Sequence, residues 1–320
     1  MDSETSPRSS NRRRLGAVTL LGIVLGVAAL GFVVFRLRNN YDEAEAVVRD
    51  ADLGWLGVAL IVAAAAMTAM AAPWREVLRV FGVHRGRGDT IARYFAGEIG
   101  KYLPGGVWPL IGRGELVARV GVPRSAAYGS VALSLGCLYV AASLLVVVAI
   151  PLELGGAARW TVVLAVLGVG ALHPRPFGLF LKALGRVSGS SDEPIPVPSW
   201  GTGIALVLRY VPAWVLVGTS TWLVTVGLGE QDDALRIIAA GVLSWIVGFV
   251  VAPVPGGIGI REAAFVAACG LPAGTGAAVA LVSRMVFVAV DALGAVIAGA
   301  WLGRRSVADR ANAPSVGDAP

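Results

Sequence analysis

Charged residues are scarce in this sequence. Only 15% of its 320 residues are Asp, Glu, Lys or Arg, and 56% are hydrophobic, which gives a mean hydropathy of +0.73. A soluble globular domain carries about 25% charged residues, so this composition excludes that class. The formal net charge of +6 needs no nucleic-acid partner, because basic loops at a membrane surface explain it. We interpret the chain as an integral membrane protein.

Residues that typically carry chemistry are also few. The two cysteines, Cys137 and Cys269, lie in separate apolar runs, unlike a disulfide framework or a Cys-x-x-Cys pair. The only histidines are His84 and His173, and the sequence contains no Gly-x-Ser-x-Gly motif and no metal-ligand spacing. We therefore expect a protein that is not an enzyme and that holds no cofactor or metal.

Long apolar runs predict the membrane-spanning helices. A span needs roughly 20 residues, so the chain has room for about seven or eight crossings and little else. The predicted fold is an all-α, polytopic membrane helix bundle over residues 15–303, with cytoplasmic tails at 1–14 and 304–320, the second of them disordered. The predicted spans are Leu15–Phe35, Leu53–Trp74, Ser125–Leu152, Gly156–Leu172, Gly203–Leu228, Ile237–Val251 and Thr275–Gly303.

Basic residues in the connections predict the orientation. Arginines precede the first span and cluster after the second and fourth, whereas the connections after the first and fifth are acidic. Because basic loops stay in the cytoplasm, we expect both termini there, in the cytoplasmic membrane of a bacterium. That requires an even number of crossings, and seven runs leave one segment unaccounted for. The run Ala263–Gly270 is too short to cross alone, so with Ile258–Glu262 it forms either a short, steep crossing or the return limb of a re-entrant hairpin.

Two Pro-Gly-Gly breaks interrupt the apolar pattern. The motif at 104–106 comes before Arg113, and the motif at 255–257, 151 positions later, comes before Arg261. Broken apolar segments at corresponding positions of two halves are typical of transporter binding sites, which suggests an internal duplication. Alternatively, each break is an ordinary interfacial loop with solvated charges around it.

A phosphate-binding site is the role that we predict for these breaks. Proline removes a backbone donor and glycine loosens the chain, so in hydrocarbon such a break survives only inside a bundle or beside a cavity. A helix that restarts there presents free amides, which attract a phosphate, and nearby basic side chains strengthen that attraction. On the last span, Arg284 and Asp291 share a face, as part of this site or as a structural ion pair. The predicted substrate-binding residues are Glu98, Lys101, Tyr102, Pro104, Gly105, Gly106, Arg113, Glu115, Pro255, Gly256, Gly257, Arg261, Glu262, Arg284 and Asp291.

The two motifs resemble a known family. The stretches YFAGEIGKYLPGGVWPLIGRGELVARVGVPRSAA and, several spans later, PVPGGIGIREAAFV are similar to the membrane region of bacterial lysylphosphatidylglycerol synthases and of stand-alone flippase-like proteins. Matching positions include Gly97, Lys101 and Arg113 in the first motif and Gly259 and Arg261 in the second. The resemblance implies an all-helical membrane domain with re-entrant segments, which in the synthases moves aminoacylated phospholipid between leaflets. The 17 residues after Gly303, a polar segment that also contains Ala and Pro, are too few for the soluble domain that transfers lysine from tRNA, so we do not expect that activity.

Our leading hypothesis from the sequence is a lipid translocator. It would accept an anionic phospholipid or polyprenyl-phosphate-linked lipid from the cytoplasmic leaflet and release it on the far side. Expected partners are membrane lipids with anionic head groups and a cell-envelope glycosyltransferase or lipid synthase, with no nucleic acid. Two alternatives stay open. One is a membrane-embedded glycosyltransferase with Asp42 and Glu43 as candidate catalytic acids, and the other is a non-transporting accessory subunit of a cell-envelope lipid or glycan synthase.

Overall fold

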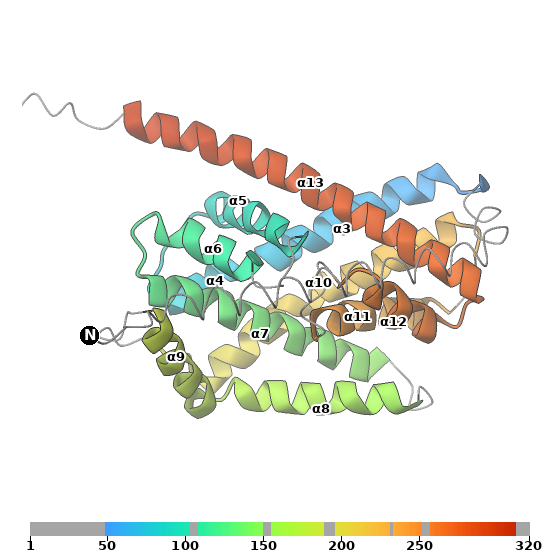
Figure 1. Cartoon of the computed structure of the whole chain (residues 1–320), viewed down its shortest axis with the longest axis horizontal. Helices are drawn as coiled ribbons and strands as arrows, with labels where there is room; N and C mark the ends of the chain where they lie inside the picture. Colours follow the sequence, from blue (N-terminus) through green and yellow to red (C-terminus); the bar gives the residue numbers. More distant parts are fainter. Residues whose placement is uncertain are drawn as a thin grey trace, which may run out of the picture.

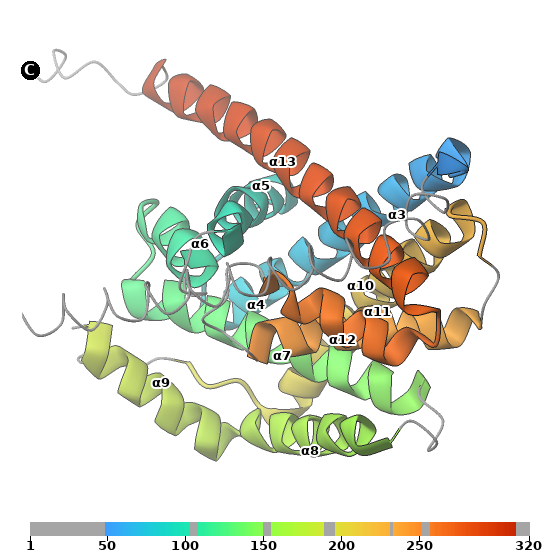
Figure 2. The same ribbon diagram turned by 45° about the vertical axis from the view of Figure 1, so that its right-hand side comes forward.

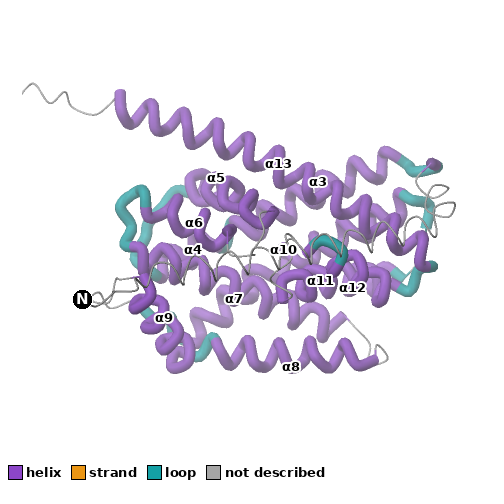
Figure 3. Tube along the Cα trace, viewed as in Figure 1, coloured by secondary structure: helices purple, strands orange, loops and turns teal. Residues whose placement is uncertain are grey.

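The chain folds into a bundle of helices. The computed structural model describes residues 49–102, 108–149, 155–188, 196–230, 233–250 and 257–311, and every regular element in these ranges is a helix, as predicted (Figures 1 and 3). The predicted span Leu15–Phe35 and the acidic residues Asp42 and Glu43 lie outside the described residues. Within the described ranges, four stretches are long and apolar enough to cross a membrane: Leu53–Val80, Arg124–Val148, Trp200–Gly227 and Ala273–Arg304.

These four stretches hold the long helices of the bundle, and shorter helices lie between them. The long stretches contain α3 (Leu53–Ala71), α4 (Trp74–Val80), α7 (Arg124–Ala149), α10 (Trp200–Gly227) and α13 (Ala273–Ala311), which continues beyond the predicted end of the membrane domain. The shorter elements are α5 (Arg87–Glu98), the 3-10 helix η1 (Ile99–Tyr102), α6 (Trp108–Ala118), α8 (Gly155–Ala171), α9 (Pro174–Ser188), α11 (Ala234–Val250) and α12 (Ile260–Cys269).

Helices α3 and α10 pack side by side in opposite directions. Each begins at a side-chain cap, Asp52 for α3 and Ser199 for α10. The Asp52 amide donates to the carbonyl of Gly227 at the end of α10 (2.7 Å), and the Ser220 hydroxyl donates to the carbonyl of Ala59 in α3 (2.9 Å). Small residues allow this close approach, as is usual between membrane helices.

Helices α5 and α6 form a helical hairpin. Arg93 in α5 donates to the Leu116 carbonyl in α6 (2.6 Å), and Arg85, just before α5, donates to the Val120 carbonyl just after α6 (2.8 Å). These contacts pair the start of one helix with the end of the other. Helices α5 and η1 therefore enter the bundle, and α6 returns to the end from which α5 came.

Helices α11 and α12 form a similar hairpin. Near the start of α11, the Arg236 side chain donates to the carbonyl of Ala268, near the end of α12 (3.2 Å). Of the two possibilities for the short run after the break, this contact supports the return limb of a hairpin. The run Ile237–Val251, predicted as a separate span, is therefore the entering limb of that hairpin.

The two hairpins enter the bundle from opposite ends of α13. A Cβ atom on Gly88, at the start of α5, would lie 3.2 Å from Trp301 in the C-terminal part of α13. A Cβ atom on Gly276, in the N-terminal part of α13, would lie 3.1 Å from Cys269 at the end of α12. Figures 1 and 2 show α5 and α6 toward one end of the bundle and α11 and α12 toward the other, with α13 running past both.

Matched contacts at a constant spacing relate the two hairpins. Arg85 and Arg236 each donate to a carbonyl at the end of the returning limb. Gly97 and Gly248 each lie against the stem of the arginine that follows the break, where no Cβ atom would fit. Both pairs are 151 residues apart, the spacing of the two Pro-Gly-Gly motifs. Because α3 and α10, which precede the hairpins, run in opposite directions, the two units form an inverted repeat.

Candidate functional site

The tip of the first hairpin contacts the middle of α13 through a buried carboxylate. The Lys101 ammonium lies 2.7 Å from Asp291 Oδ2 and 3.4 Å from Glu98 Oε2, and the Tyr102 hydroxyl donates to Asp291 (2.5 Å). Asp291 is only 1% exposed. A buried carboxylate is costly unless it is paired, and Lys101 supplies that charge. Asp291 therefore joins α13 to the first hairpin.

Arg113 on the returning limb completes this half of the site. Its guanidinium lies 3.5 Å from Glu98 Oε1 and 4.7 Å above the ring of Tyr94. The side chain is only 1% exposed. It reaches this position because Gly97 leaves room for its stem. Glu98 is therefore held between Arg113 and Lys101.

The tip of the second hairpin forms its own ion pair with α13. Glu262 pairs with Arg284 (2.5 Å), and its other oxygen accepts a hydrogen bond from the Gly259 amide at the start of α12 (2.5 Å). A carboxylate at this end of a helix complements the partial positive charge there. At α12, Glu262 thus takes the place that the sequence had suggested for a phosphate, and the basic side chains around it become the better candidates.

Arg261 differs from the other basic residues of the site. Its guanidinium stacks on Trp245 at 3.8 Å from the ring centre. Its stem covers Gly248 and Gly257, whose positive φ of 66° suits glycine. Among the described residues, no carboxylate lies within ion-pairing distance of Arg261. Trp245 also lies 5.5 Å from the Lys101 ammonium, so it connects the two tips.

Together these side chains form what we call the charged cluster: Glu98, Lys101, Arg113, Arg261, Glu262, Arg284 and Asp291. It contains four basic and three acidic residues, which leaves one excess positive charge. Two small spaces adjoin Arg261, and each admits about one water molecule. Buried polar atoms usually have hydrogen-bond partners, yet Arg113 Nη1, Ser283 Oγ and Asp291 Oδ1 have none within the described part of the chain.

Most of the predicted substrate-binding residues that the structure describes meet in this cluster. Tyr102 and Gly257 adjoin it. Arg284 and Asp291 do not pair with each other as suggested: Arg284 pairs with Glu262 of the second hairpin, and Asp291 pairs with Lys101 of the first. Pro104, Gly105, Gly106, Pro255 and Gly256 lie outside the described residues.

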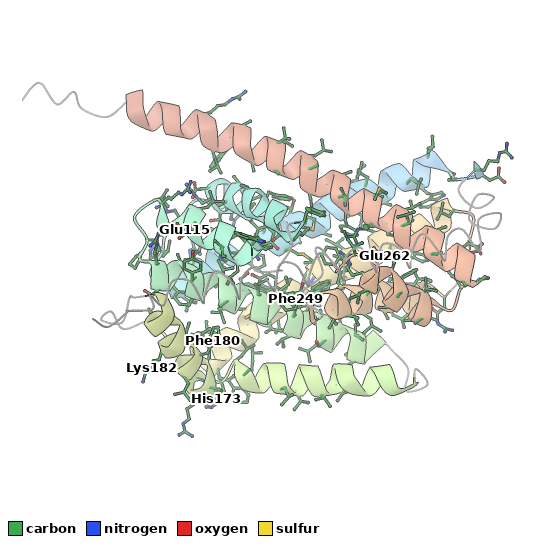
Figure 4. All side chains as sticks on the ribbon, in the orientation of Figure 1. Glu115, His173, Phe180, Lys182, Phe249 and Glu262 are labelled. Atoms are coloured by element: carbon green, nitrogen blue, oxygen red, sulfur yellow. The ribbon has the colours of Figure 1, made fainter. Side chains whose placement is uncertain are left out.

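Glu115 is the exception. It accepts a hydrogen bond from Tyr128 (2.9 Å) and lies 3.4 Å from Arg124, and Figure 4 shows it far from Glu262. Two positions along a helix turn a side chain by about 200°, so Glu115 cannot share the face of Arg113. The structure therefore places Glu115 apart from the charged cluster.

Sequence reasoning missed the aromatic platforms of the two arginines. Tyr94 lies under Arg113 and Trp245 lies under Arg261. Both residues come three positions before the glycine that accommodates the arginine stem, and they are 151 residues apart. A comparison of the sequence with itself at that spacing would have found them.

Metal binding has no support in the structure as described. Among residues 49–311, less the gaps noted above, no three His, Cys, Asp or Glu side chains gather closely enough to hold a metal ion. The chemistry of the charged cluster is instead that of ion pairs and hydrogen-bond donors.

A model of a membrane-protein family matches most of the chain. The model of the lysylphosphatidylglycerol synthase TM region matches residues 19–295, a range that includes both hairpins and most of α13. The chain belongs to this family. The resemblance expected from the two motifs is thus confirmed, and the apolar helices agree with a multi-pass membrane protein. No curated protein matches the chain.

Proposed function

We propose that this member of the lysylphosphatidylglycerol synthase TM family moves an anionic lipid across the membrane and binds its phosphate at Arg261. The observation that carries the proposal is the position of Arg261 in the charged cluster. The other six charges form ion pairs with one another, whereas Arg261 lies on an aromatic ring and has no ion-pair partner within the described part of the chain. A guanidinium in that position can bind a phosphodiester through two hydrogen bonds.

Charge balance supports a monoanionic head group. The cluster has one excess positive charge, which a single phosphodiester would neutralise. A net charge within the membrane is costly, so binding an anion lowers that cost. The hydroxyl of Ser283 and the second guanidinium nitrogen of Arg113 are further donors without a partner among the described residues.

The inverted repeat supports movement between two sides. In many transporters, two inverted units take turns in opening a central site. Here the two related faces of the bundle differ. An apolar groove of about 520 Å³ lies between α3, α5 and α13 and is open along one side. On the related face, Phe249 of α11 stacks on Tyr139 of α7 (3.8 Å), which in turn contacts Trp214 of α10. In the proposed cycle the two faces exchange these states.

The basic connections supply the proposed orientation. The open end of the first hairpin lies next to the arginine-rich segment 75–93, which includes most of α4 and the start of α5. Under the positive-inside rule, this end lies in the cytoplasm. The second hairpin then opens toward the acidic loop at 230–233 on the outer side. Both termini are cytoplasmic in this arrangement, and the membrane is the cytoplasmic membrane of a bacterium. The protein acts as a translocator and not as an enzyme.

Lipid movement in reconstituted vesicles tests the proposal. Wild-type protein should speed the exchange of fluorescent phosphatidylglycerol or a polyprenyl phosphate between leaflets. Arg261→Gln should slow it roughly tenfold to a hundredfold, because hydrogen bonds to a charged group are worth about 1.5–3 kcal/mol.

Arg209→Gln is the matched control, because Arg209 is exposed on α10 and bonds only its own helix at Ala205. It should behave like the wild type. Equal activity of Arg261→Gln and wild type would remove Arg261 from the site. If the isolated protein moves no anionic lipid at all, the accessory-subunit hypothesis replaces the translocator.

A further inference from the structure

The groove between α3, α5 and α13 lies next to the charged cluster and is much larger than the two small spaces beside Arg261. Its walls are almost entirely apolar, and they include Leu60, Ile91, Phe95 and Leu293. The hydroxyl of Thr68, also in the wall, already donates to the Ala64 carbonyl of its own helix (2.8 Å). A wall of this kind favours hydrocarbon over a polar head group.

One end of the groove reaches the charged cluster. On α5, Phe95 lines the groove and Glu98, one turn later, belongs to the cluster. On α13, Val290 lines the groove and the next residue, Asp291, belongs to the cluster. Helices α5 and α13 cross so closely here that a Cβ atom on Gly294 of α13 would overlap the ring of Phe95 of α5. The groove and the cluster are thus neighbours separated by one narrow crossing.

The other end of the groove is basic. It is formed by Gly88 and Trp301, which lie against each other. Arg87 precedes Gly88, and Arg304 follows Trp301 by one turn, and both side chains are exposed. Tryptophan and arginine are typical of the membrane–water interface. An anionic head group at this end would therefore meet two positive charges.

We infer that the groove is a loading site, in which an anionic lipid rests with one hydrocarbon chain between α3, α5 and α13 and its head group at Arg87 and Arg304. The lipid keeps the orientation that it has in its own leaflet. To reach Arg261, its head group then has to move along the groove and past the crossing of α5 and α13. This inference rests on the proposed function and adds to it a second lipid site with its own residues.

Photo-crosslinking tests the loading site without requiring transport. The probes are phosphatidylglycerol and phosphatidylcholine, each with a diazirine in the middle of an acyl chain, added to the full chain in nanodiscs. The phosphatidylglycerol probe should label Ile61, Ile91 and Leu293 more strongly than the phosphatidylcholine probe does. Exchanging Arg87 and Arg304 for glutamine should abolish that preference. Each charge removed should lower the ratio of phosphatidylglycerol to phosphatidylcholine labelling roughly fivefold.

Two tryptophan variants on α3 separate the groove from the general lipid-facing surface. Ala64 and Ala65 are neighbours and both exposed, but only Ala64 lines the groove. Ala64→Trp should fill the groove and lower labelling of Ile91 and Leu293 roughly tenfold, since each displaced methylene weakens binding several-fold. Ala65→Trp should leave the labelling unchanged. Both variants should elute as single peaks in size-exclusion chromatography, because their side chains point outward.

The outcomes distinguish this inference from the proposed function. Equal labelling by both probes, or Ala64→Trp labelled like the wild type, would identify ordinary surrounding lipid and overturn the loading site. Transport that depends on Arg261 without selective groove labelling would leave the proposed function standing. Selective labelling in a protein that moves no lipid would support the loading site and overturn the proposed function.

Discussion

Arg113 and Arg261 have similar surroundings. Each lies over an aromatic ring, Tyr94 or Trp245, and each passes its stem over a glycine of the entering helix. The glycine is required because a methyl group there would overlap the stem. The aromatic face attracts the guanidinium. Each arginine is thus held in one position by its aliphatic part. The guanidinium of Arg113 pairs with Glu98 and donates to the Pro109 carbonyl, whereas that of Arg261 has no ion-pair partner among the described residues.

Gly248→Ala should destabilise the protein. The added methyl group would overlap the stem of Arg261, and overpacking of this kind costs about 1–3 kcal/mol. We expect a lower midpoint of thermal unfolding in detergent.

Gly57→Ala is the control for this variant. Gly57 also lies in a helix, but a Cβ atom there would meet nothing within 4 Å. This substitution should stabilise the protein by about 0.5–1 kcal/mol, because alanine favours a helix over glycine. A midpoint for Gly248→Ala at or above that of the wild type would show that Arg261 has room to move.

At the scale of elements, the antiparallel pair α3 and α10 determines how the two repeats are related. The pair is held by backbone contacts near one end, where the Asp52 amide meets the Gly227 carbonyl. If the helices ran in the same direction, the two hairpins would open on the same side of the bundle. The contact between these helices therefore supports the whole inverted arrangement.

A disulfide between α3 and α10 tests this arrangement. A Cβ atom on Gly227 would lie 3.2 Å from the Cβ of Trp55, close to the roughly 3.5–4.5 Å of a disulfide. Trp55→Cys with Gly227→Cys, in a background with Cys137 and Cys269 replaced by alanine, should form an intramolecular bond on mild oxidation. Mass spectrometry of the linked peptides would identify it.

Gly57→Cys with Gly227→Cys is the matched control, since Gly57 has no neighbour within 4 Å. It should stay reduced under the same conditions. Linkage in the control with none in the first pair would show that α3 and α10 meet through different faces.

At the scale of the whole molecule, much of the architecture could be predicted from the sequence. The low charge content predicted a helical membrane protein, and the two Pro-Gly-Gly motifs fall in the sequence between the helices that form the two hairpins. Charged residues next to a break are costly in lipid unless they meet partners. For this reason Lys101, Arg261 and Glu262 could be chosen from the sequence as candidate site residues.

Other features depend on tertiary contacts that the sequence does not contain. A 17-residue apolar helix such as α11 fits either a crossing or one limb of a hairpin, and only the contact between Arg236 and Ala268 decides between them. Trp245 looked like any aromatic residue of an apolar helix until Arg261 was found above it. Glu115 shares the motif of Arg113 but not its face of the helix.

The central claim of this account is that two hairpins enter from opposite sides of the membrane and meet at one charged cluster. Single cysteines at Gly86 and Leu235, both exposed at the open ends of the two hairpins, test it most directly in the background without Cys137 and Cys269. A membrane-impermeant maleimide should label Leu235→Cys from outside sealed cells and Gly86→Cys only in inverted vesicles. Labelling of both cysteines from the same side would contradict the account.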